Sequence, residues 1–212
     1  MYPPCMKSVP AVALTIVMSM GPALAGDPPP ERKVGRALLT FYWIVDETSS
    51  RYDGKRDTEL RDSRGKVIAL THARFRRDVI MEGTGWLRDG RTIRFHKTVR
   101  GEHRFRVIKS RYGITASGCP AEPYRTVAVD PRFVKIGSKI YIPQLKGTML
   151  PDGTKHDGIF VAQDRGVFKG AHVDVFVGVG PRSTAPFIRH GNRSRSHVTV
   201  YLEGSKVRRC RA

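Results

Sequence analysis

After residue 35 the chain alternates short apolar runs with polar and turn-forming residues. The runs are rich in Val, Ile, Phe and Tyr and are bounded by Gly, Pro, Asp and Ser, a pattern typical of β-strands. Helical patterning is confined to residues 70–75 and 184–189. Many short strands with little helix predict an all-β barrel or sandwich, and the lack of an interior linker predicts one domain. The expected strands are residues 37–45, 66–70, 92–95, 105–109, 126–129, 139–143, 158–164, 172–179 and 197–202.

The first 25 residues have the pattern of a secretory signal peptide. Lys7 precedes an apolar run over residues 9–20, and the small residues Ala23 and Ala25 form a cleavage site before Gly26. A membrane anchor is the alternative, but this run is shorter than the roughly 20 residues that span a bilayer. No later stretch is long enough to span one. The sequence therefore predicts an exported protein, in the periplasm, the extracellular space or the cell wall, with no membrane span.

Composition distinguishes both ends of the expected domain, which covers residues 35–204. Residues 26–34 are rich in Pro and polar residues and predict a flexible leader, while residues 205–212 form a basic tail. The whole chain has 38 Lys and Arg residues and 19 Asp and Glu residues, which gives a formal net charge of +19. This excess predicts an anionic partner, and a merely solvated basic surface is the alternative.

The predicted export bears on the state of the cysteines. Of the 3 cysteines, Cys5 lies in the predicted signal peptide, which leaves Cys119 and Cys210. In an exported protein such a pair is more often bonded than free, and a bond would tie the tail to the loop before Pro120. The chain-entropy model gives that long loop a stabilisation on the order of 4 kcal/mol. Two unpaired thiols are the alternative. The spacing of Cys and His matches no metal motif, so neither a metal nor another cofactor is expected.

Two aspartates interrupt apolar strands and are the first candidates for chemistry. Strict alternation places Asp164 on one face with Phe160, and it places Asp174 with Phe176 opposite the neighbouring valines. The loop between the two strands, residues 165–171, is short enough to bring the aspartates near each other. A charged residue in the centre of an apolar strand needs a reason, and a carboxylate in a cleft supplies one.

Each candidate aspartate also has a purely structural interpretation. Asp130 ends an expected strand just before Pro131, which favours a cap on a turn over catalysis. Asp164 precedes Arg165 and Gly166, so a turn-forming role is an equal alternative. Asp174 could instead point to solvent from a half-exposed strand.

Several segments together resemble a known family. They are residues 126–131 (TVAVDP), 136–143 (IGSKIYIP), 162–166 (AQDRG), 169–170 (KG) and 173–176 (VDVF). This set, which lies within residues 106–180, is similar to the 3D domain, named for its three aspartates. Residues 39–43 (LTFYW) also resemble the strand that opens such domains, and residues 156–158 (HDG) resemble the segment before the second aspartate.

The resemblance implies a fold and an activity. The 3D domain is a six-stranded double-psi β-barrel, found in lytic transglycosylases of the membrane-bound type A class and, as a fold, in expansins. We therefore expect an all-β barrel with additional short strands and few short helices. The implied reaction cleaves the β-1,4 bond between N-acetylmuramic acid and N-acetylglucosamine in peptidoglycan and leaves a 1,6-anhydro end. Peptidoglycan strands and the acidic cell-envelope surface are the expected partners.

The same resemblance assigns roles to residues. Asp174 matches the catalytic acid, Asp164 the residue that supports it, and Asp130 the first aspartate. Thr40, Tyr42 and Lys169 are candidates for glycan binding, with core packing for Tyr42 and a solvated loop for Lys169 as alternatives.

The sequence departs from the family pattern at one point. A single glycine, Gly166, follows Asp164 where the family has two, so the loop to Asp174 is one residue shorter. This departure favours a rival function, a non-catalytic, expansin-like module that binds cell-wall glycan. A second rival, a nucleic-acid binder, is supported by charge alone and is disfavoured by export and by the lack of a nucleic-acid motif.

Overall fold

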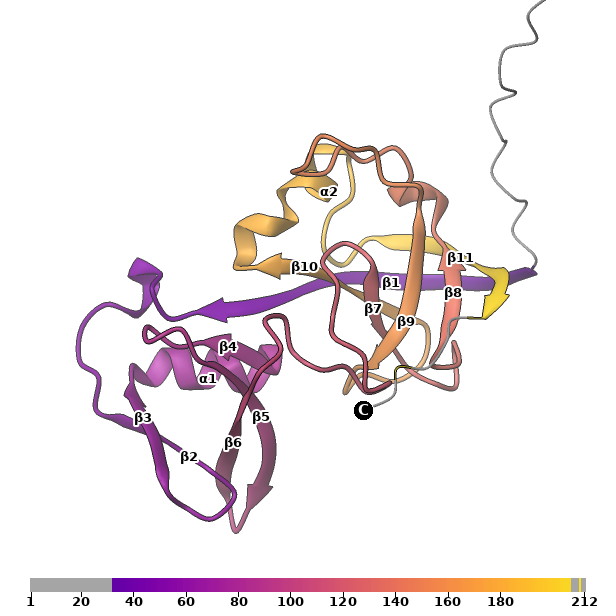
Figure 1. The fold of residues 1–212 in the computed structure, drawn as a ribbon. Coiled ribbons are helices and arrows are strands. Elements are labelled where there is room, and N and C mark those ends of the chain that lie inside the picture. Colours follow the sequence, from indigo (N-terminus) through magenta and orange to yellow (C-terminus); the bar gives the residue numbers. More distant parts are fainter. Residues whose placement is uncertain (1–31, 207–209, 211–212) are drawn as a thin grey trace, which may run out of the picture.

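The computed structural model describes residues 32–206 and Cys210. The predicted signal peptide (1–25) lies outside the described residues, as do most of the leader and most of the basic tail. The described chain has two lobes joined by one long strand, β1 (Arg32–Asp46), which runs from the larger lobe into the smaller one (Figure 1). Strand β1 thus begins inside the range expected for the leader.

The larger lobe is a closed six-stranded barrel. Its strands follow the order β10-β7-β9-β8-β11-β1, and a further pairing between β1 and β10 closes the ring. The β1–β10 and β7–β9 pairs are parallel, while the other neighbours are antiparallel. The predicted fold class, an all-β six-stranded barrel with extra short strands and few helices, is confirmed. Besides β1, the barrel strands are β7 (Thr126–Val129), β8 (Ser138–Tyr141), β9 (Ile159–Arg165), β10 (His172–Val179) and β11 (His197–Lys206).

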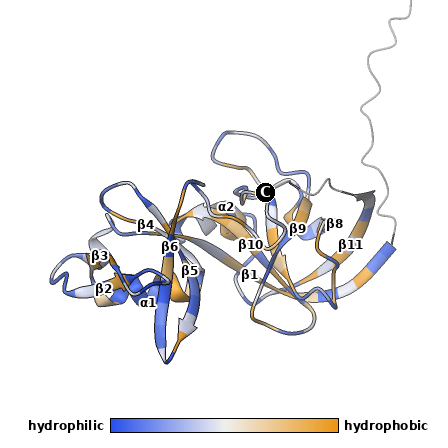
Figure 2. Ribbon diagram, turned by 60° about the horizontal axis from the view of Figure 1, so that its bottom comes forward, coloured by the Kyte–Doolittle hydropathy of each residue, from blue (hydrophilic) through white to orange (hydrophobic). Residues whose placement is uncertain are grey.

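Alternation along the strands fills the barrel. On β10, Val173, Val175 and Val177 point inward and are buried, as expected for a strand with one face on a core. Helix α2 (Ala185–Arg189) supplies Phe187, which stacks on Phe41 with ring centroids 5.5 Å apart. Short 3-10 turns at Pro143–Leu145 and Pro181–Thr184 complete this lobe. Figure 2 shows many hydrophobic residues on the barrel strands, whereas hydrophilic residues lie on loops and also along β5 and β6.

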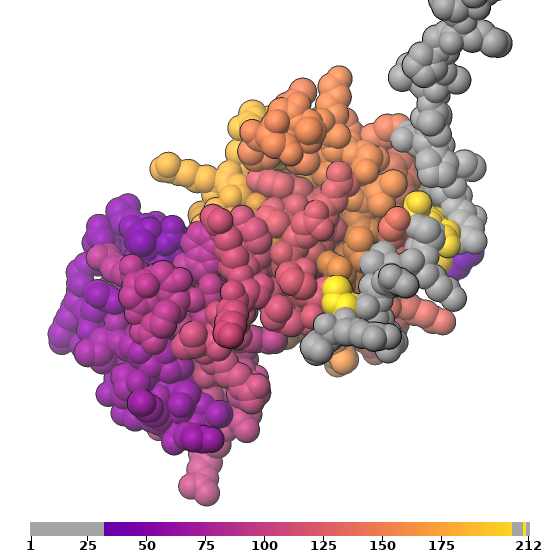
Figure 3. All heavy atoms as spheres, viewed as in Figure 1, coloured from indigo at the N-terminus to yellow at the C-terminus, as the bar shows by residue number. Residues whose placement is uncertain are grey.

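The smaller lobe has its own core, separate from that of the barrel. It buries, among others, Leu60, Phe75, Ile93 and Phe105. The range 35–204, expected as one barrel domain, is thus built as two lobes, with the segment after β6 lying between them (Figure 3). The smaller lobe consists of the end of β1, a 3-10 turn (Ser50–Tyr52), β2 (Thr58–Arg61), β3 (Val67–Thr71), α1 (Ala73–Glu82), β4 (Thr84–Trp86), β5 (Thr92–Val99) and β6 (Glu102–Ile108).

The helix expected at residues 70–75 is wrong in the first half of its range. Strand β3 continues to Thr71, His72 caps the helix by accepting a hydrogen bond from the Arg74 N–H, and α1 then runs to Glu82. Gly83 ends it in the left-handed conformation, at φ 85°. The second expected helix is present as α2, one residue later than expected at its start.

A disulfide joins Cys119 and Cys210, whose Cα atoms lie 5.1 Å apart. Cys119 is buried in the segment between β6 and β7. The bond fixes Cys210 to the segment that lies between the two lobes.

Candidate active site

The candidate residues Thr40, Asp174 and Asp164 lie in one row across four neighbouring barrel strands. Thr40 on β1 is the register partner of Asp174 on β10, Asp174 is the partner of Ala128 on β7, and Ala128 is the partner of Asp164 on β9. Two strand spacings, about 10 Å, therefore separate the backbones of the two aspartates. The small side chain of Ala128 lies between them on the outer face of the barrel, so the shortened loop does not remove them from one site.

Asp164 reaches this face because β9 is irregular. The register shifts by one residue between Val127 and Ala128 of its partner strand, which makes Gln163 an extra residue in β9. Phe160 and Ala162 point into the core, whereas Asp164 turns outward. The prediction that Asp164 shares a face with Phe160 is therefore wrong, and the bulge is the reason.

Asp174 is a half-buried carboxyl in the middle of an apolar strand. Its Oδ1 accepts a hydrogen bond of 2.6 Å from the Thr40 hydroxyl. Among the described residues it forms no ion pair with a cation. Burial raises its pKa to about 6, the charge of Asp164 adds to this rise, and the Thr40 hydrogen bond opposes it.

Thr40 also contacts a histidine that sequence reasoning missed. The His172 Nε2 atom lies 2.7 Å from the Thr40 hydroxyl oxygen. Burial lowers the pKa of His172, which favours the neutral ring near pH 7. Phe168 from the short loop stacks on His172 with centroids 3.7 Å apart. A side chain at Gly166 would collide with Phe168, so glycine is required for this stacking. His172 lies two residues before Asp174, and strand alternation was the available signal that the two share a face.

Asp164 and Tyr42 form the other end of the row. The Tyr42 hydroxyl donates to Asp164 Oδ2 at 3.4 Å, and the Ala116 N–H donates to Asp164 Oδ1 at 3.0 Å. Burial, followed by the charges of Asp164 and Asp174, holds the pKa of Tyr42 well above its usual value. Tyr42 therefore stays a neutral donor on this face, where its ring also packs on Phe176.

A second acid that sequence reasoning missed lies at the end of α1. Glu82 Oε2 accepts a hydrogen bond of 3.3 Å from the Trp43 N–H of β1. Burial and, to a smaller extent, the charge of Asp174 raise the pKa of Glu82 to about 7, while the Trp43 hydrogen bond opposes this rise. A glutamate at a helix end resembles a solvated surface residue in the sequence, so no signal identified it.

Asp130 and Lys169 lie away from this row. Asp130 is 4% exposed and accepts hydrogen bonds from the Arg132 side chain and from the N–H groups of Arg132 and Gly170. The Arg132 guanidinium and these N–H groups hold the pKa of Asp130 far below its usual value. Lys169 is exposed and lines a recess of about 650 Å³ together with Asp130 and Arg132.

Two negative findings concern the part of the chain that the structure describes. No helix there is both long and apolar enough to cross a membrane. Within residues 32–206 and Cys210, no group of three or more His, Cys, Asp and Glu side chains is arranged to hold a metal ion.

Residues 125–201 match the family model of the 3D domain. This part of the chain is similar to the 3D domain, as the motifs predicted, and it contains Asp130, directly after β7, and the barrel strands that carry Asp164 and Asp174. The match covers residues 125–201 of the chain, and the strands of this segment belong to the closed six-stranded barrel.

Solved structures of the lytic transglycosylase MltA have a similar fold. The E. coli enzyme with bound chitohexaose superposes with a TM-score of 0.56 at 13% identity, over 79% of this chain and 71% of that chain. The Neisseria gonorrhoeae enzyme superposes with a TM-score of 0.50 at 13% identity, over 83% and 75%. At these identities the likeness establishes the fold. No curated protein sequence matches the chain.

Proposed function

We propose that the protein is a peptidoglycan lytic transglycosylase. It cleaves the β-1,4 bond between N-acetylmuramic acid and N-acetylglucosamine and leaves a 1,6-anhydromuramoyl end. The observation that carries this proposal is Asp174, a half-buried carboxyl with a raised pKa and no cationic partner among the described residues. The 3D-domain match and the MltA-like fold support the same class of reaction.

A single carboxyl group is sufficient for this reaction. Protonated Asp174 donates its proton to the glycosidic oxygen as the bond to the anomeric carbon breaks. The resulting carboxylate accepts the proton of the sugar's own 6-hydroxyl, whose oxygen attacks the anomeric carbon and closes the anhydro ring. Asp174 ends the cycle protonated, and no water is consumed. The paired carboxylates of ordinary glycosidases are therefore not required.

In this proposal Thr40 and His172 decide which oxygen of Asp174 carries the proton. Neutral His172 donates its Nε2–H to Thr40, so the single hydroxyl hydrogen of Thr40 is directed to Asp174 Oδ1. With Oδ1 engaged as an acceptor, the acidic proton is carried by Oδ2. Thr40, expected from the sequence to bind glycan, is thus assigned a positioning role.

Asp164 and Tyr42 complete the proposed site. The negative charge of Asp164 helps to keep Asp174 protonated near neutral pH, since it raises the pKa of that carboxyl. The neutral Tyr42 hydroxyl is available as a donor to glycan oxygens at the same face. Asp130 is assigned a structural role, because its hydrogen bonds to Arg132 and to the Gly170 N–H join the segment after β7 to the loop before β10.

The proposed substrate belongs to the cell envelope, which agrees with export by the predicted signal peptide. In this proposal the protein acts in the periplasm or at the cell wall and contacts peptidoglycan strands and the acidic envelope surface. The charge of the chain, +19, favours association with such surfaces.

Digestion of purified sacculi in H₂¹⁸O tests this function. The expected products are muropeptides with anhydro ends and no ¹⁸O at the new terminus, because the attacking oxygen belongs to the sugar. Products that carry ¹⁸O would identify a hydrolase. Binding to sacculi without any release would replace the enzyme with the expansin-like wall-binding module.

A further inference from the structure

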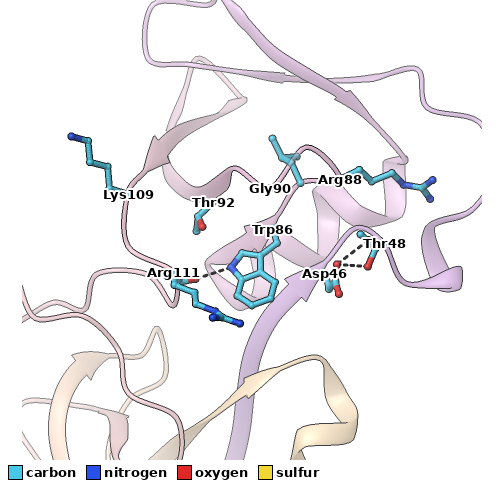
Figure 4. Close-up of a pocket in the computed structure, with 9 residues that line it drawn as sticks. Asp46, Thr48, Trp86, Arg88, Gly90, Thr92, Lys109 and Arg111 are labelled. Carbon is cyan, nitrogen blue, oxygen red and sulfur yellow. Dashed lines mark hydrogen bonds between the residues drawn. The ribbon is translucent and has the colours of Figure 1, made fainter.

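A second concave site lies on the smaller lobe, where β1, β4 and the segment after β6 meet. It has a volume of about 520 Å³, within the usual range for small-ligand pockets. Its polar and aromatic lining consists of Asp46, Thr48, Trp86, Arg88, Thr92, Lys109 and Arg111 (Figure 4). None of these residues has a role in the proposed cleavage.

The centre of this pocket is rigid. The Trp86 indole N–H donates to the Arg111 carbonyl oxygen at 2.7 Å, which fixes the ring, and Trp86 stacks on Tyr112 with centroids 6.1 Å apart. The Arg111 guanidinium carbon lies 5.3 Å from the Trp86 ring and 5.5 Å from the Tyr112 ring. These cation–π contacts hold a planar set of donors beside an aromatic surface, so little ordering is needed when a ligand binds.

The charges of the lining leave two cations without an acidic partner among the described residues, Arg111 and Lys109. Arg88 is engaged with Asp53 at 2.9 Å. The carboxylate of Asp46 accepts hydrogen bonds from the N–H and hydroxyl groups of Thr48. In Figure 4 the Arg111 side chain lies beside the indole, while Lys109 and Arg88 extend outward on opposite sides.

A chain of aromatic contacts connects this pocket to the proposed active site. Tyr112 meets Phe176 with centroids 5.9 Å apart, and Phe176 meets Tyr42 at 5.1 Å. Tyr42 in turn donates to Asp164. Phe176 also follows Asp174 by two residues on the same face of β10. Phe176 is fully buried, so one packed aromatic cluster joins the pocket to the catalytic row.

We infer that the Trp86 pocket binds an acid-bearing sugar of the glycan strand, with the sugar ring on the indole and the carboxylate of its peptide substituent on Arg111. Peptidoglycan places such carboxylates on every muramoyl residue, whereas an unsubstituted chitin-type chain has none. Lys109 adds positive charge at the rim, and the ordered carboxylate of Asp46 remains an acceptor for sugar hydroxyls. This inference deepens the proposed function, because it specifies peptide-bearing glycan as the preferred substrate.

Binding to the full chain, followed by NMR, tests the inference without any turnover. The probes are a GlcNAc–MurNAc-tetrapeptide disaccharide, which lacks the bond to be cleaved, and uncharged chitohexaose. The chain has 2 Trp, so the Trp86 indole signal can be assigned with Trp86→Phe. The muropeptide should shift this signal, and Arg111→Gln should weaken its binding about tenfold or more, as for other charge-assisted hydrogen bonds. Chitohexaose affinity should stay unchanged in Arg111→Gln.

Two further variants make the test specific. Arg106→Gln removes the same charge from an exposed position on β6 outside the pocket and should bind both probes as the wild type does. Arg111→Lys keeps the positive charge but loses the planar guanidinium. Its affinity for the muropeptide should therefore lie between that of the wild type and that of Arg111→Gln. An unmoved Trp86 signal, or an equal loss of both probes in Arg111→Gln, would overturn the inference. Either result leaves the proposed cleavage untouched, because anhydro-end release is measured separately.

Discussion

Asp174 and Asp130 belong to the same domain but lie in opposite environments. Asp174 is half-buried in an apolar strand, receives one hydroxyl hydrogen bond and has a pKa of about 6. At Asp130 the Arg132 guanidinium and two N–H groups hold the pKa far below the usual range. Desolvation thus dominates at Asp174, whereas stabilising partners dominate at Asp130. Of these two aspartates, only Asp174 can act as a proton donor near neutral pH.

The largest expected effect comes from Asp174→Asn. Asn is nearly isosteric with the carboxyl but cannot exchange a proton, so release of anhydro muropeptides should fall by about 10² to 10⁴ or more. Sacculus binding should be retained. Asp53→Asn, which removes an exposed carboxylate on the smaller lobe, should keep full activity as the matched control. Wild-type activity in Asp174→Asn would contradict the assignment.

Asp174→Asn should also raise the stability of the folded protein at high pH, whereas a substitution that disrupts folding would lower it. Because the folded-state pKa of Asp174 is raised, its favourable contribution is present below pH 4 and is lost as the pH rises through about 6. The variant should therefore melt at a higher temperature than the wild type at pH 8, and the difference should vanish near pH 4. Thermal melts followed by circular dichroism measure this, and a lower melting temperature at pH 8 would contradict the environment described here.

Thr40→Val should have the next largest effect. It removes the hydrogen bond that lowers the pKa of Asp174 and directs its proton to Oδ2, so kcat should fall about tenfold or more. The pH optimum should move upward. Thr40→Ser keeps the hydroxyl and should retain most activity and the wild-type optimum. Equal pH–rate profiles for Thr40→Val and Thr40→Ser would show that the Thr40 hydroxyl does not position Asp174.

Asp130→Asn should act through stability. Its carboxylate joins Arg132 to the Gly170 N–H, so the melting temperature should drop by several degrees at pH 7, with a smaller loss of activity. Since the folded-state pKa of Asp130 is lowered, this contribution is present above about pH 4 and is lost as the pH falls further. The difference in melting temperature should therefore shrink in acid, and a difference independent of pH would contradict the assignment.

Asp164→Asn should have the smallest effect on activity. It should shift the pH optimum in the opposite direction to Thr40→Val. Removal of the Asp164 charge lowers the pKa of Asp174, so the optimum for anhydro-end release should move to lower pH with a modest loss of rate. A pH–rate profile for each variant compares the two directions. An upward shift in Asp164→Asn would exclude a like-charge effect.

The barrel was largely predictable from the sequence, because its strands alternate clearly. Residues 126–129 and 172–179 are strands with the predicted bounds, since inward valines and outward polar or aromatic residues mark both faces. The smaller lobe was less predictable. Its strand β2 is the polar run Thr58–Arg61 and β4 has only three residues, so neither has a recognisable period.

The candidate site was predictable in its residues but not in its contacts. Asp174 was identified from its apolar strand and Thr40 from the family resemblance, and the structure makes the two register partners. The outward turn of Asp164 depends on a bulge against β7, which only the partner strand defines. Likewise, Glu82 reaches β1 only because α1 packs in the smaller lobe. Contacts of this kind join residues far apart in the sequence, and local sequence patterns do not predict them.

A titration of the aspartate carboxyl groups by ¹³C NMR tests the central comparison most directly. Asp174→Asn and Asp130→Asn assign the two signals in the full chain. We predict that the Asp174 carboxyl titrates near pH 6, while the pKa of the Asp130 carboxyl lies far below the usual value of an aspartate. An Asp174 carboxyl that titrates at or below pH 4 would contradict this prediction, because Asp174 would then be a carboxylate with no proton to donate near neutral pH.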